Sequence, residues 1–434
     1  MSSLKRLSPI VVVLGLVLAA CTSSSPSGSP AGSGGTADLH GASVTVIGSW
    51  TDAEQASFLA MVKPWEDSTG AKVKYQGTRA INDILAAGIP TGVLPDLAGI
   101  PGLGQLSEYV QAGVLQPLDS ALDLPTYKSE TSPGLVPLGQ INGKTYGVFL
   151  KASLKGMIFY IPSLHDYSKD VPKTWTDLMS AAGANQGNAK AIWCLGLSAG
   201  AASGWPATDW IENILLRQAG PQVYNDWWAG KVKWTDPAIK AAFTTYMDDV
   251  VAHSFGGGTL ANATKFDVAG DPLFTTPPGC EIFQQANFLT GQGAFAKKTA
   301  GTDYNAFPMP AFNDQFANAV EGGGDIFGMF HATPAAKSLM AYLVTAPAQD
   351  IWVKRGGFIS ANKNATDYSD EFTKNLAATI TNAKQFVFDA SDRMPTDMNA
   401  AFWQHMVSLT SNKETVDEAL NALQKVADDA YKAS

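Results

Sequence analysis

One short segment has the spacing of a hydrolase nucleophile. Gly196-Leu-Ser198-Ala-Gly200 matches the pattern that exposes a serine on a sharp turn after a strand. That pattern also requires a helix directly after the serine, whereas residues 201–206 are glycine, proline and small residues with one tryptophan. We therefore expect a loop here and no catalytic residue. A carboxylate pair for glycoside hydrolysis stays open, although no local motif marks one.

The ionisable residues are too dispersed for a metal centre or a nucleic-acid surface. No two of the five histidines have the spacing of zinc ligands, so we expect no metal and no cofactor. The formal net charge is −9, and the chain has no basic cluster. Because phosphate contacts need lysine and arginine, we expect no nucleic-acid partner.

Aromatic residues in loops favour ligand binding instead. Trp205 lies in a Gly/Pro loop, and Trp50 follows the first expected strand, where open α/β sheets bind ligands. Such rings stack on the C–H faces of sugars, while polar neighbours hold the hydroxyls. In Glu321-Gly-Gly-Gly-Asp325, three glycines allow close approach of the backbone, and the carboxylates can accept hydrogen bonds. The structural alternatives are a tryptophan that covers the core and a glycine-rich surface turn.

The elements that would position these residues form two successive α/β series. The first begins with a strand at 44–47, a capping-box helix start at Thr51-Asp-Ala-Glu54 that ends at Gly70, and a strand at 73–75. This alternation predicts a parallel sheet. The chain has 434 residues, more than one core usually organises, so we expect two lobes.

Residues 146–160 separate the two series and read as a strand-like crossover below a cleft. Asn142-Gly143 before them predicts a tight hairpin. The second series has a strand at 192–195, a helix at 208–219 that stops at Gly220-Pro221, and a helix start at Asp236-Pro237. Thr333-Pro334 repeats that start signal, and the C-terminal stretch 375–434 reads as helices.

The N-terminus has the pattern of an exported protein. Lys5 and Arg6 precede a short apolar run at 10–18, and Leu18-Ala19-Ala20-Cys21 then resembles the lipobox of bacterial lipoproteins. The resemblance implies a signal peptide over residues 1–20 and a lipid on Cys21. An ordinary secretory signal is the alternative. Several acyl chains would hold the chain firmly at a membrane, because each buried methylene contributes about 0.8 kcal/mol.

Residues 21–40 comprise this cysteine and a flexible Ser/Gly/Pro tether with a reach of roughly 20–25 Å. Two cysteines remain, Cys194 and Cys280. Outside the cytoplasm they could form a disulfide, worth roughly 4–5 kcal/mol in the chain-entropy model. Two buried free thiols are the alternative.

The order of several motifs resembles a known family. The chain is similar to the extracellular solute-binding lipoproteins of ABC importers, and more narrowly to their carbohydrate-binding group of alpha-glucoside or maltose type. The motifs are Lys63-Pro64-Trp65-Glu66, Gly77-Thr78-Arg79, Leu94-Pro95-Asp96-Leu97-Ala98-Gly99, Leu115-Gln116-Pro117-Leu118-Asp119, Gly204-Trp205-Pro206-Ala207-Thr208-Asp209-Trp210, Gly322-Gly323-Gly324-Asp325-Ile326-Phe327, Gly356-Gly357-Phe358-Ile359-Ser360, Phe388-Asp389-Ala390-Ser391-Asp392 and Phe402-Trp403.

The resemblance implies an α/β, two-lobe periplasmic-binding-protein-like fold with a ligand cleft between the lobes. Lobe 1 would comprise 41–148 and 312–354, and lobe 2 would comprise 152–308 and 356–434. The hinge crossings would lie near 149–151, 309–311 and 355.

The resemblance also implies ligand-binding residues. They are Trp50, Thr78, Arg79 and Asp325 in lobe 1, Lys151 and Ser153 at the crossing, and Trp205, Phe358 and Arg393 in lobe 2. A structural salt bridge is the alternative for Arg393, and a role confined to the hinge is the alternative for Lys151 and Ser153.

We therefore expect a monomeric, non-enzymatic sugar-binding component of an ABC importer. It would be anchored at Cys21 on the extracellular face of the membrane and would deliver a carbohydrate, such as an alpha-glucoside oligosaccharide, to the permease. The alternatives are a secreted carbohydrate-active hydrolase and a binding protein for a peptide, a polyamine or another non-sugar ligand.

Overall fold

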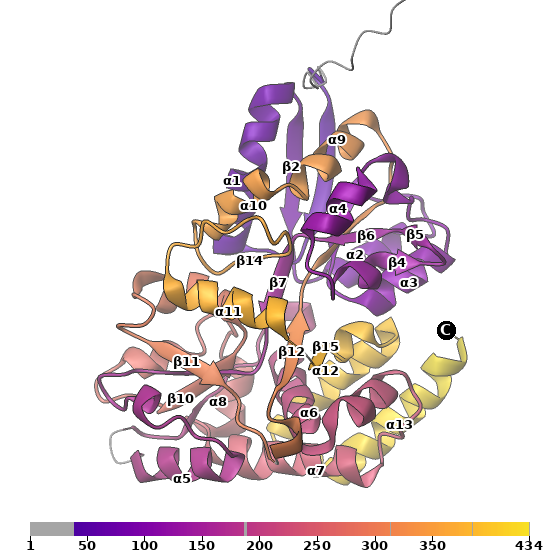
Figure 1. Ribbon diagram of the computed structural model, residues 1–434. Helices are drawn as coiled ribbons and strands as arrows, with labels where there is room; N and C mark the ends of the chain where they lie inside the picture. The colour runs from indigo at the N-terminus through magenta and orange to yellow at the C-terminus, as the bar shows by residue number, and fades with distance from the viewer. Residues whose placement is uncertain (1–38, 186–188, 313, 384, 434) are drawn as a thin grey trace, which may run out of the picture. The chain divides into compact units, whose positions relative to one another are not determined.

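The computed structural model describes residues 39–185, 189–312, 314–383 and 385–433 (Figure 1). Cys21, the expected signal peptide and nearly all of the expected tether lie outside the described residues. Within the described part, no helix is both long and apolar enough to cross a bilayer.

A five-stranded sheet has the order β2-β1-β3-β13-β6. Strands β1 (Ser43–Gly48), β2 (Lys72–Gly77) and β3 (Leu97–Ile100) are parallel, which confirms the sheet predicted from the first series. Strand β13 (Ile326–Met329) inserts antiparallel between β3 and β6 (Gly147–Phe149). One sheet is therefore built from segments that lie far apart in the sequence.

Local sequence signals set the ends of helix α1 (Asp52–Thr69), whereas tertiary contacts occupy its Glu54 side chain. It begins after Thr51 as the capping box predicts, and it ends at Gly70, whose φ of 74° suits glycine. Thr51 makes no side-chain cap, however, and the Glu54 carboxylate contacts Lys151 and Arg79. Helix α1 packs beside α10 (Ala346–Val353), as Figure 1 shows.

A four-stranded sheet has the order β11-β8-β10-β9. Strand β8 (Met157–Tyr160) is antiparallel to β10 (Ile282–Gln285) and to β11 (Asn305–Pro308), and β9 (Trp193–Cys194) is parallel to β10. A large apolar core rich in tryptophan packs against it.

A second four-stranded sheet has the order β14-β7-β12-β15. Along the chain, three of its strands come directly before or after elements that belong to or pack on the five-stranded sheet. The chain leaves β6 for β7 (Lys151–Leu154) and leaves β12 (Ala319–Gly323) for β13, and α10 leads to β14 (Ile359–Ser360). We call β14-β7-β12-β15 the crossing sheet. The stretch 146–160 thus supplies one strand to each of three sheets.

Strand β15 (Gln385–Phe388) corrects the expectation that the C-terminal stretch is all helical. It pairs in parallel with β12, which lies much earlier in the chain, so its strand conformation depends on a distant partner. The Glu321-Gly-Gly-Gly-Asp325 run is also not a surface turn. Its first residues belong to β12, and Glu321 is fully buried.

Other local predictions are confirmed by the structure. Helices α7 (Pro237–Thr245) and α9 (Pro334–Leu343) begin at the two predicted caps, and both cap side chains accept a backbone N–H. The Asn142-Gly143 turn joins β4 (Gln140–Ile141) to β5 (Lys144–Thr145) with both φ angles positive. Helix α6 (Trp205–Trp228) continues past the predicted stop, but Gly220 breaks it with φ 85° and ψ 171°.

The remaining helices complete the fold. They are α2 (Ile81–Gly88), α3 (Leu103–Gln111), α4 (Leu124–Glu130), α5 (Trp175–Asn185), α8 (Gly257–Ala263), α11 (Glu371–Asn382), α12 (Thr396–Thr410) and α13 (Val416–Ala433).

Candidate functional site

A cavity of about 140 Å³ lies at the carboxyl end of β1, beside the first turn of α1. Segments from the five-stranded sheet, the crossing sheet and α6 all contribute to its wall. Five of its lining residues are ionisable, Glu54, Arg79, Lys151, Asp325 and Asp392. Aromatic rings make up much of the rest of the wall.

Glu54 is the central charged group of the cavity wall. Lys151 Nζ contacts one of its oxygens, and Arg79 Nη2 lies 3.4 Å from the other. Burial opposes ionisation of Glu54, but the two cations outweigh it and hold the pKa of this carboxyl below its usual value. The pairs thus keep a buried carboxylate charged.

Lys151 lies among aromatic rings as well as beside Glu54. Its Nζ is 5.1 Å from the ring centroid of Phe288 and 5.6 Å from that of Trp352. The side chain is 4% exposed, and Lys151 is the first residue of β7. A strand of the crossing sheet therefore positions this cation at the cavity wall.

Asp325 lies between β12 and β13 and is held by residues that follow β1. Its oxygens accept hydrogen bonds from Ser49 Oγ at 2.9 Å and from Trp50 Nε1 at 2.7 Å. Burial raises the pKa of the Asp325 carboxyl, against the neighbouring Lys151 ammonium. Trp50 itself is 2% exposed, and its ring packs against Phe327 in the core. Its indole edge, rather than an open face, is turned to polar partners.

The opposite wall is an aromatic group. Trp205, the first residue of α6, packs 5.2 Å from Phe266 and 5.9 Å from Phe288 between ring centroids. Arg79 Cζ lies 4.7 Å from the centroid of Phe266, so the charged wall and the aromatic wall meet there. Trp403 adds a further ring.

Six of the nine residues expected to bind ligand line this cavity: Trp50, Arg79, Lys151, Ser153, Trp205 and Asp325. The other three, Thr78, Phe358 and Arg393, lie elsewhere. Thr78 Oγ1 accepts the N–H of Ala80, and Phe358 is fully buried with its ring 4.7 Å from that of Trp352.

Arg393 stacks its guanidinium 3.8 Å from the ring centroid of Trp228. The preceding residue, Asp392, lines the cavity instead. The capping-box pattern explains Glu54 as a residue of a helix start, so the sequence does not mark it as a ligand-binding residue. Phe266 and Phe288 follow no local pattern that marks a ligand site, whereas Trp403 belongs to the Phe402-Trp403 motif, to which no ligand contact was assigned.

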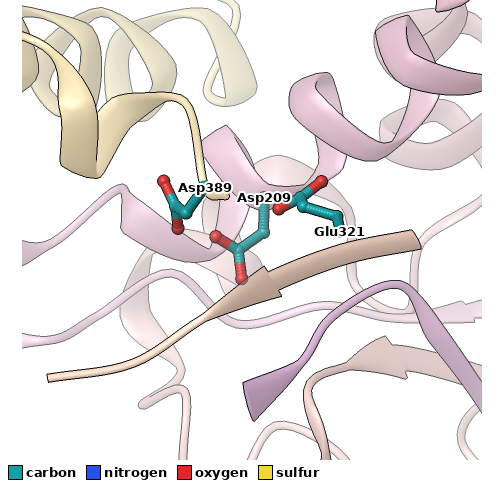
Figure 2. A group of neighbouring side chains, drawn as sticks. All are labelled: Asp209, Glu321 and Asp389. Carbon is teal, nitrogen blue, oxygen red and sulfur yellow. The ribbon is translucent and has the colours of Figure 1, made fainter. Parts of the chain in front are cut away.

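Behind the cavity lies a buried carboxylate cluster formed by Asp209, Glu321 and Asp389 (Figure 2). One oxygen of each lies within 4.8 Å of the others, a spacing that suits a cation. Lys155 Nζ already lies 2.7 Å from Asp209 Oδ1 and contacts Asp389. Lys155 therefore supplies the positive charge in this cluster.

Asp389 also connects the cluster to the cavity. Its Oδ1 accepts the hydroxyl of Ser391 at 2.9 Å and the N–H of Asp392 at 3.0 Å. Burial opposes its ionisation, but Lys155 outweighs this effect and lowers the pKa of Asp389. The Lys155–Asp389 pair thus holds the turn that presents Asp392 to the cavity.

Glu321 differs from the other two members of the cluster. Neither of its carboxyl oxygens has a hydrogen-bond partner within the described part of the chain. Burial raises its pKa well above the usual value, and burial raises the pKa of Asp209 to about 7. Burial therefore favours the protonated form of Glu321.

We expect Glu321→Gln to stabilise the protein at pH 8 and to change little at pH 5. A carboxyl with a raised folded-state pKa takes up a proton on folding, so stability falls as pH rises from the unfolded-state pKa of about 4.3 through the folded-state value. Between these two pKa values the free energy of unfolding falls by about 1.4 kcal/mol per pH unit. The amide does not titrate, so it removes this dependence on pH. Thermal unfolding of both proteins across pH 5–8 measures the effect.

The exposed carboxylate Glu371 provides the matched control, and Glu371→Gln should follow the wild-type profile. Parallel pH profiles for wild type and Glu321→Gln would contradict the raised pKa of Glu321.

Cys194 and Cys280, the two cysteines of the described chain, lie in bonding contact with Cα atoms 5.2 Å apart. This Cα separation is usual for a disulfide. The bond would join β9 to the segment just before β10, across a sequence separation of 86.

A cavity lined by aromatic and hydrogen-bonding side chains, at the carboxyl end of an α/β sheet, has the composition and position of a small-molecule binding site. Residues 60–380 match the family model of bacterial extracellular solute-binding proteins. The chain belongs to this family, whose members bind solutes outside the cytoplasm.

Two relatives are similar over nearly their full lengths. The osmoprotective compounds-binding protein GgtB of Synechocystis sp. is 30% identical over 403 residues, covering 91% of this chain and 94% of that protein. The alpha-glucosides-binding periplasmic protein AglE of Rhizobium meliloti is 30% identical over 401 residues, covering 88% and 86%.

Among solved structures, a chitin oligosaccharide binding protein has a TM-score of 0.77 at 21% identity, covering 90% of this chain and 99% of that one. The solute receptor AcbH has a TM-score of 0.75 at 21% identity over the same shares. These matches confirm the expected two-lobe α/β fold.

Proposed function

We propose that this protein is the substrate-binding component of an ABC-type sugar importer. The observation that carries the proposal is the cavity, whose wall combines the aromatic group around Trp205 with the hydrogen-bonding groups of Glu54, Arg79 and Asp325. Sugars present both an apolar C–H face and a rim of hydroxyls, and this wall offers a partner for each. The names of GgtB and AglE support a small glycoside or related osmoprotectant as the ligand class.

The proposed lobes follow the sheets except at β12, which falls in lobe 1 by sequence but pairs with β15 and β7 of lobe 2. Lobe 1 (41–148 and 312–354) holds the five-stranded sheet, and lobe 2 (152–308 and 356–434) holds the β11-β8-β10-β9 sheet. The crossings near 149–151 and 355 fall between these sheets and strands of the crossing sheet, while 309–311 directly follows β11. A ligand shifts the equilibrium toward the closed state by the difference between its binding free energies for the closed and open states.

The proposed contacts are Trp50, Arg79, Lys151, Ser153, Trp205 and Asp325, with Glu54, Asp392 and Trp403 added from the cavity wall. Thr78, Phe358 and Arg393 would support these residues indirectly, through the turn after β2, the core beside Trp352 and the turn that carries Asp392.

Calorimetric titration tests the proposal. Maltose, trehalose, sucrose and longer glucosides are titrated into the purified protein, and at least one should bind with 1:1 stoichiometry. Absence of heat and of any thermal shift across the panel would overturn the sugar-binding function.

We also propose that no catalysis occurs. The carboxyl pair Glu54 and Asp325 has pKa values shifted in opposite directions, as in a glycosidase, which keeps a hydrolase as the second candidate. However, both oxygens of Glu54 contact cations and both oxygens of Asp325 accept hydrogen bonds, so neither is placed as a free acid or nucleophile. The bound glucoside should be recovered intact, and release of reducing sugar would favour the hydrolase.

The chain would act as a monomer on the extracellular face of the cell membrane, anchored by a lipid on Cys21, and would deliver its ligand to the permease. The lipobox-like segment supports the anchor. Replacement of Cys21 by serine should release the protein from membranes, and full retention of that variant would argue against the anchor.

A further inference from the structure

Helix α3 begins at the rim of the cavity and contacts the turn that carries Asp392. Pro101, which lies just before α3, lines the cavity, and so does Asp392. Gly102 and Gly104 lie against the backbone of residues 392–394. Because α3 belongs to proposed lobe 1 and this turn to proposed lobe 2, the contact joins the lobes beside the ligand site. We call it the rim contact.

The rim contact leaves no room for a side chain on the first turn of α3. A Cβ on Gly104 would lie 1.9 Å from the carbonyl oxygen of Met394 and 2.8 Å from its carbonyl carbon. A Cβ on Gly102 would lie 3.0 Å from the carbonyl oxygen of Asp392. The obstructing atoms belong to the backbone, so rotation of a side chain cannot relieve the overlap.

The conformation of α3 does not itself require glycine at position 104. Gly104 lies within the helix and does not have a positive φ. Glycine inside a helix is less favourable than alanine, because it loses more conformational freedom on folding. The close approach of Met394 is therefore what the glycine at this position permits.

The turn on the other side of the rim contact is held firmly within lobe 2. The N–H of Met394 donates to Ser391 O at 3.2 Å. The buried carboxylate of Glu212 accepts the N–H of Ala390 at 2.8 Å and that of Ser391 at 3.3 Å. The turn cannot retreat from a larger residue on α3 without straining these hydrogen bonds. A larger residue at the rim contact would therefore keep the lobes apart.

We infer that Gly104 is the residue that permits full closure of the cleft, because its missing side chain lets α3 reach the carbonyl of Met394. Full closure in turn sets where Asp392 meets the ligand, so Gly104 is a positioning residue. This inference rests on the proposed function, in which the lobes close around a sugar. It assigns to one hydrogen atom on α3 a control over affinity that the cavity wall does not reveal.

Gly104→Ala should lower affinity without lowering stability. The ligand-free protein can accommodate the methyl group by keeping its lobes apart, so it should unfold at the wild-type temperature or slightly above it. Maltose, trehalose and sucrose are titrated by calorimetry, and the affinity for each one that binds wild type should fall at least tenfold. A residue needed only for folding would lose stability instead.

Two other glycines provide matched controls. A Cβ on Gly258 in α8 would lie 1.7 Å from Thr410 O, which is a backbone overlap inside one proposed lobe. Gly258→Ala should therefore lower the unfolding temperature and leave sugar affinity unchanged. Gly183 in α5 is exposed, with open space around its Cβ position, and Gly183→Ala should keep the wild-type affinity.

Cross-linking tests the rim contact without any sugar. Thr396 Oγ1 donates to Glu108 Oε2 at 2.6 Å across the two proposed lobes, so cysteines at these two positions should be joined by a short bismaleimide. Mass spectrometry of the linked peptides measures the rate. Adding Gly104→Ala to the cysteine pair should slow the linkage at least fivefold, whereas adding Gly183→Ala should not.

An unchanged affinity in Gly104→Ala, or an unchanged rate of cross-linking, would overturn the role of Gly104 and leave the sugar-binding function intact. Failure of wild type to bind any sugar would overturn the proposed function. Slower cross-linking with Gly104→Ala would in that case still support the control of closure by Gly104.

Discussion

Lys151→Met should lower both the stability and the sugar affinity of the protein, and a second substitution should separate the two effects. Lys151 is buried and contacts the Glu54 carboxylate, so its loss leaves a buried charge with only Arg79, 3.4 Å away. Removing one member of a buried pair costs about 3–5 kcal/mol. Urea unfolding of the ligand-free protein measures this loss.

Adding Glu54→Gln should restore most of the stability, because the remaining pair is then neutral and similar in volume. Sugar affinity should stay at least tenfold below wild type, since the cavity has lost two charged hydrogen-bonding groups. Full recovery of affinity in the double variant would confine Lys151 and Glu54 to a structural role. Unchanged stability in Lys151→Met would contradict the pairing itself.

Glu108→Ala should weaken sugar binding although Glu108 does not line the cavity. Its carboxylate in α3 accepts the N–H of Thr396 at 2.9 Å and its hydroxyl at 2.6 Å, at the start of α12. These residues belong to different proposed lobes, so the two hydrogen bonds stabilise the lobe arrangement that forms the cavity, which we propose is the closed one. Hydrogen bonds to a charged group contribute about 1.5–3 kcal/mol each. A loss of about 1.4 kcal/mol from closure lowers the apparent affinity about tenfold.

Calorimetry measures the affinity, and small-angle scattering should show a larger radius of gyration for ligand-free Glu108→Ala. Glu414→Ala is the matched control, because Glu414 pairs with His405 inside one proposed lobe. It should change stability without changing affinity. Wild-type affinity in Glu108→Ala would exclude this contact as a determinant of closure.

The parts of the fold that sequence predicted are those set by neighbouring residues. The caps at Asp236 and Thr333 and the stop at Gly70 depend on a few adjacent backbone groups, and the structure has each of them. Strand β15 was missed because its partner is β12, and nothing within its own few residues specifies that pairing.

The residues of the candidate site also fall into those that sequence motifs predict and those that only distant contacts bring to the cavity. The sequence predicts Lys151 from its place at a crossing and Asp325 from the glycine-rich Glu321-Gly-Gly-Gly-Asp325 motif, and both residues line the cavity. Glu54 was assigned to a helix cap, yet its partner Lys151 is 97 residues away in sequence. Phe288 lies on a short helical turn after β10, and only the packing of that turn against Lys151 brings its ring to the cavity wall.

The position of β13 has a consequence for how the chain is made. Because β13 lies between β3 and β6, a chain synthesised only as far as Phe149 leaves an edge of each of those strands unpaired. The gap closes only after Met329 has been added, when a large part of the polypeptide has followed β6. Open strand edges template association with other chains. During a long interval of synthesis, these strand edges are therefore open to pairing with other chains.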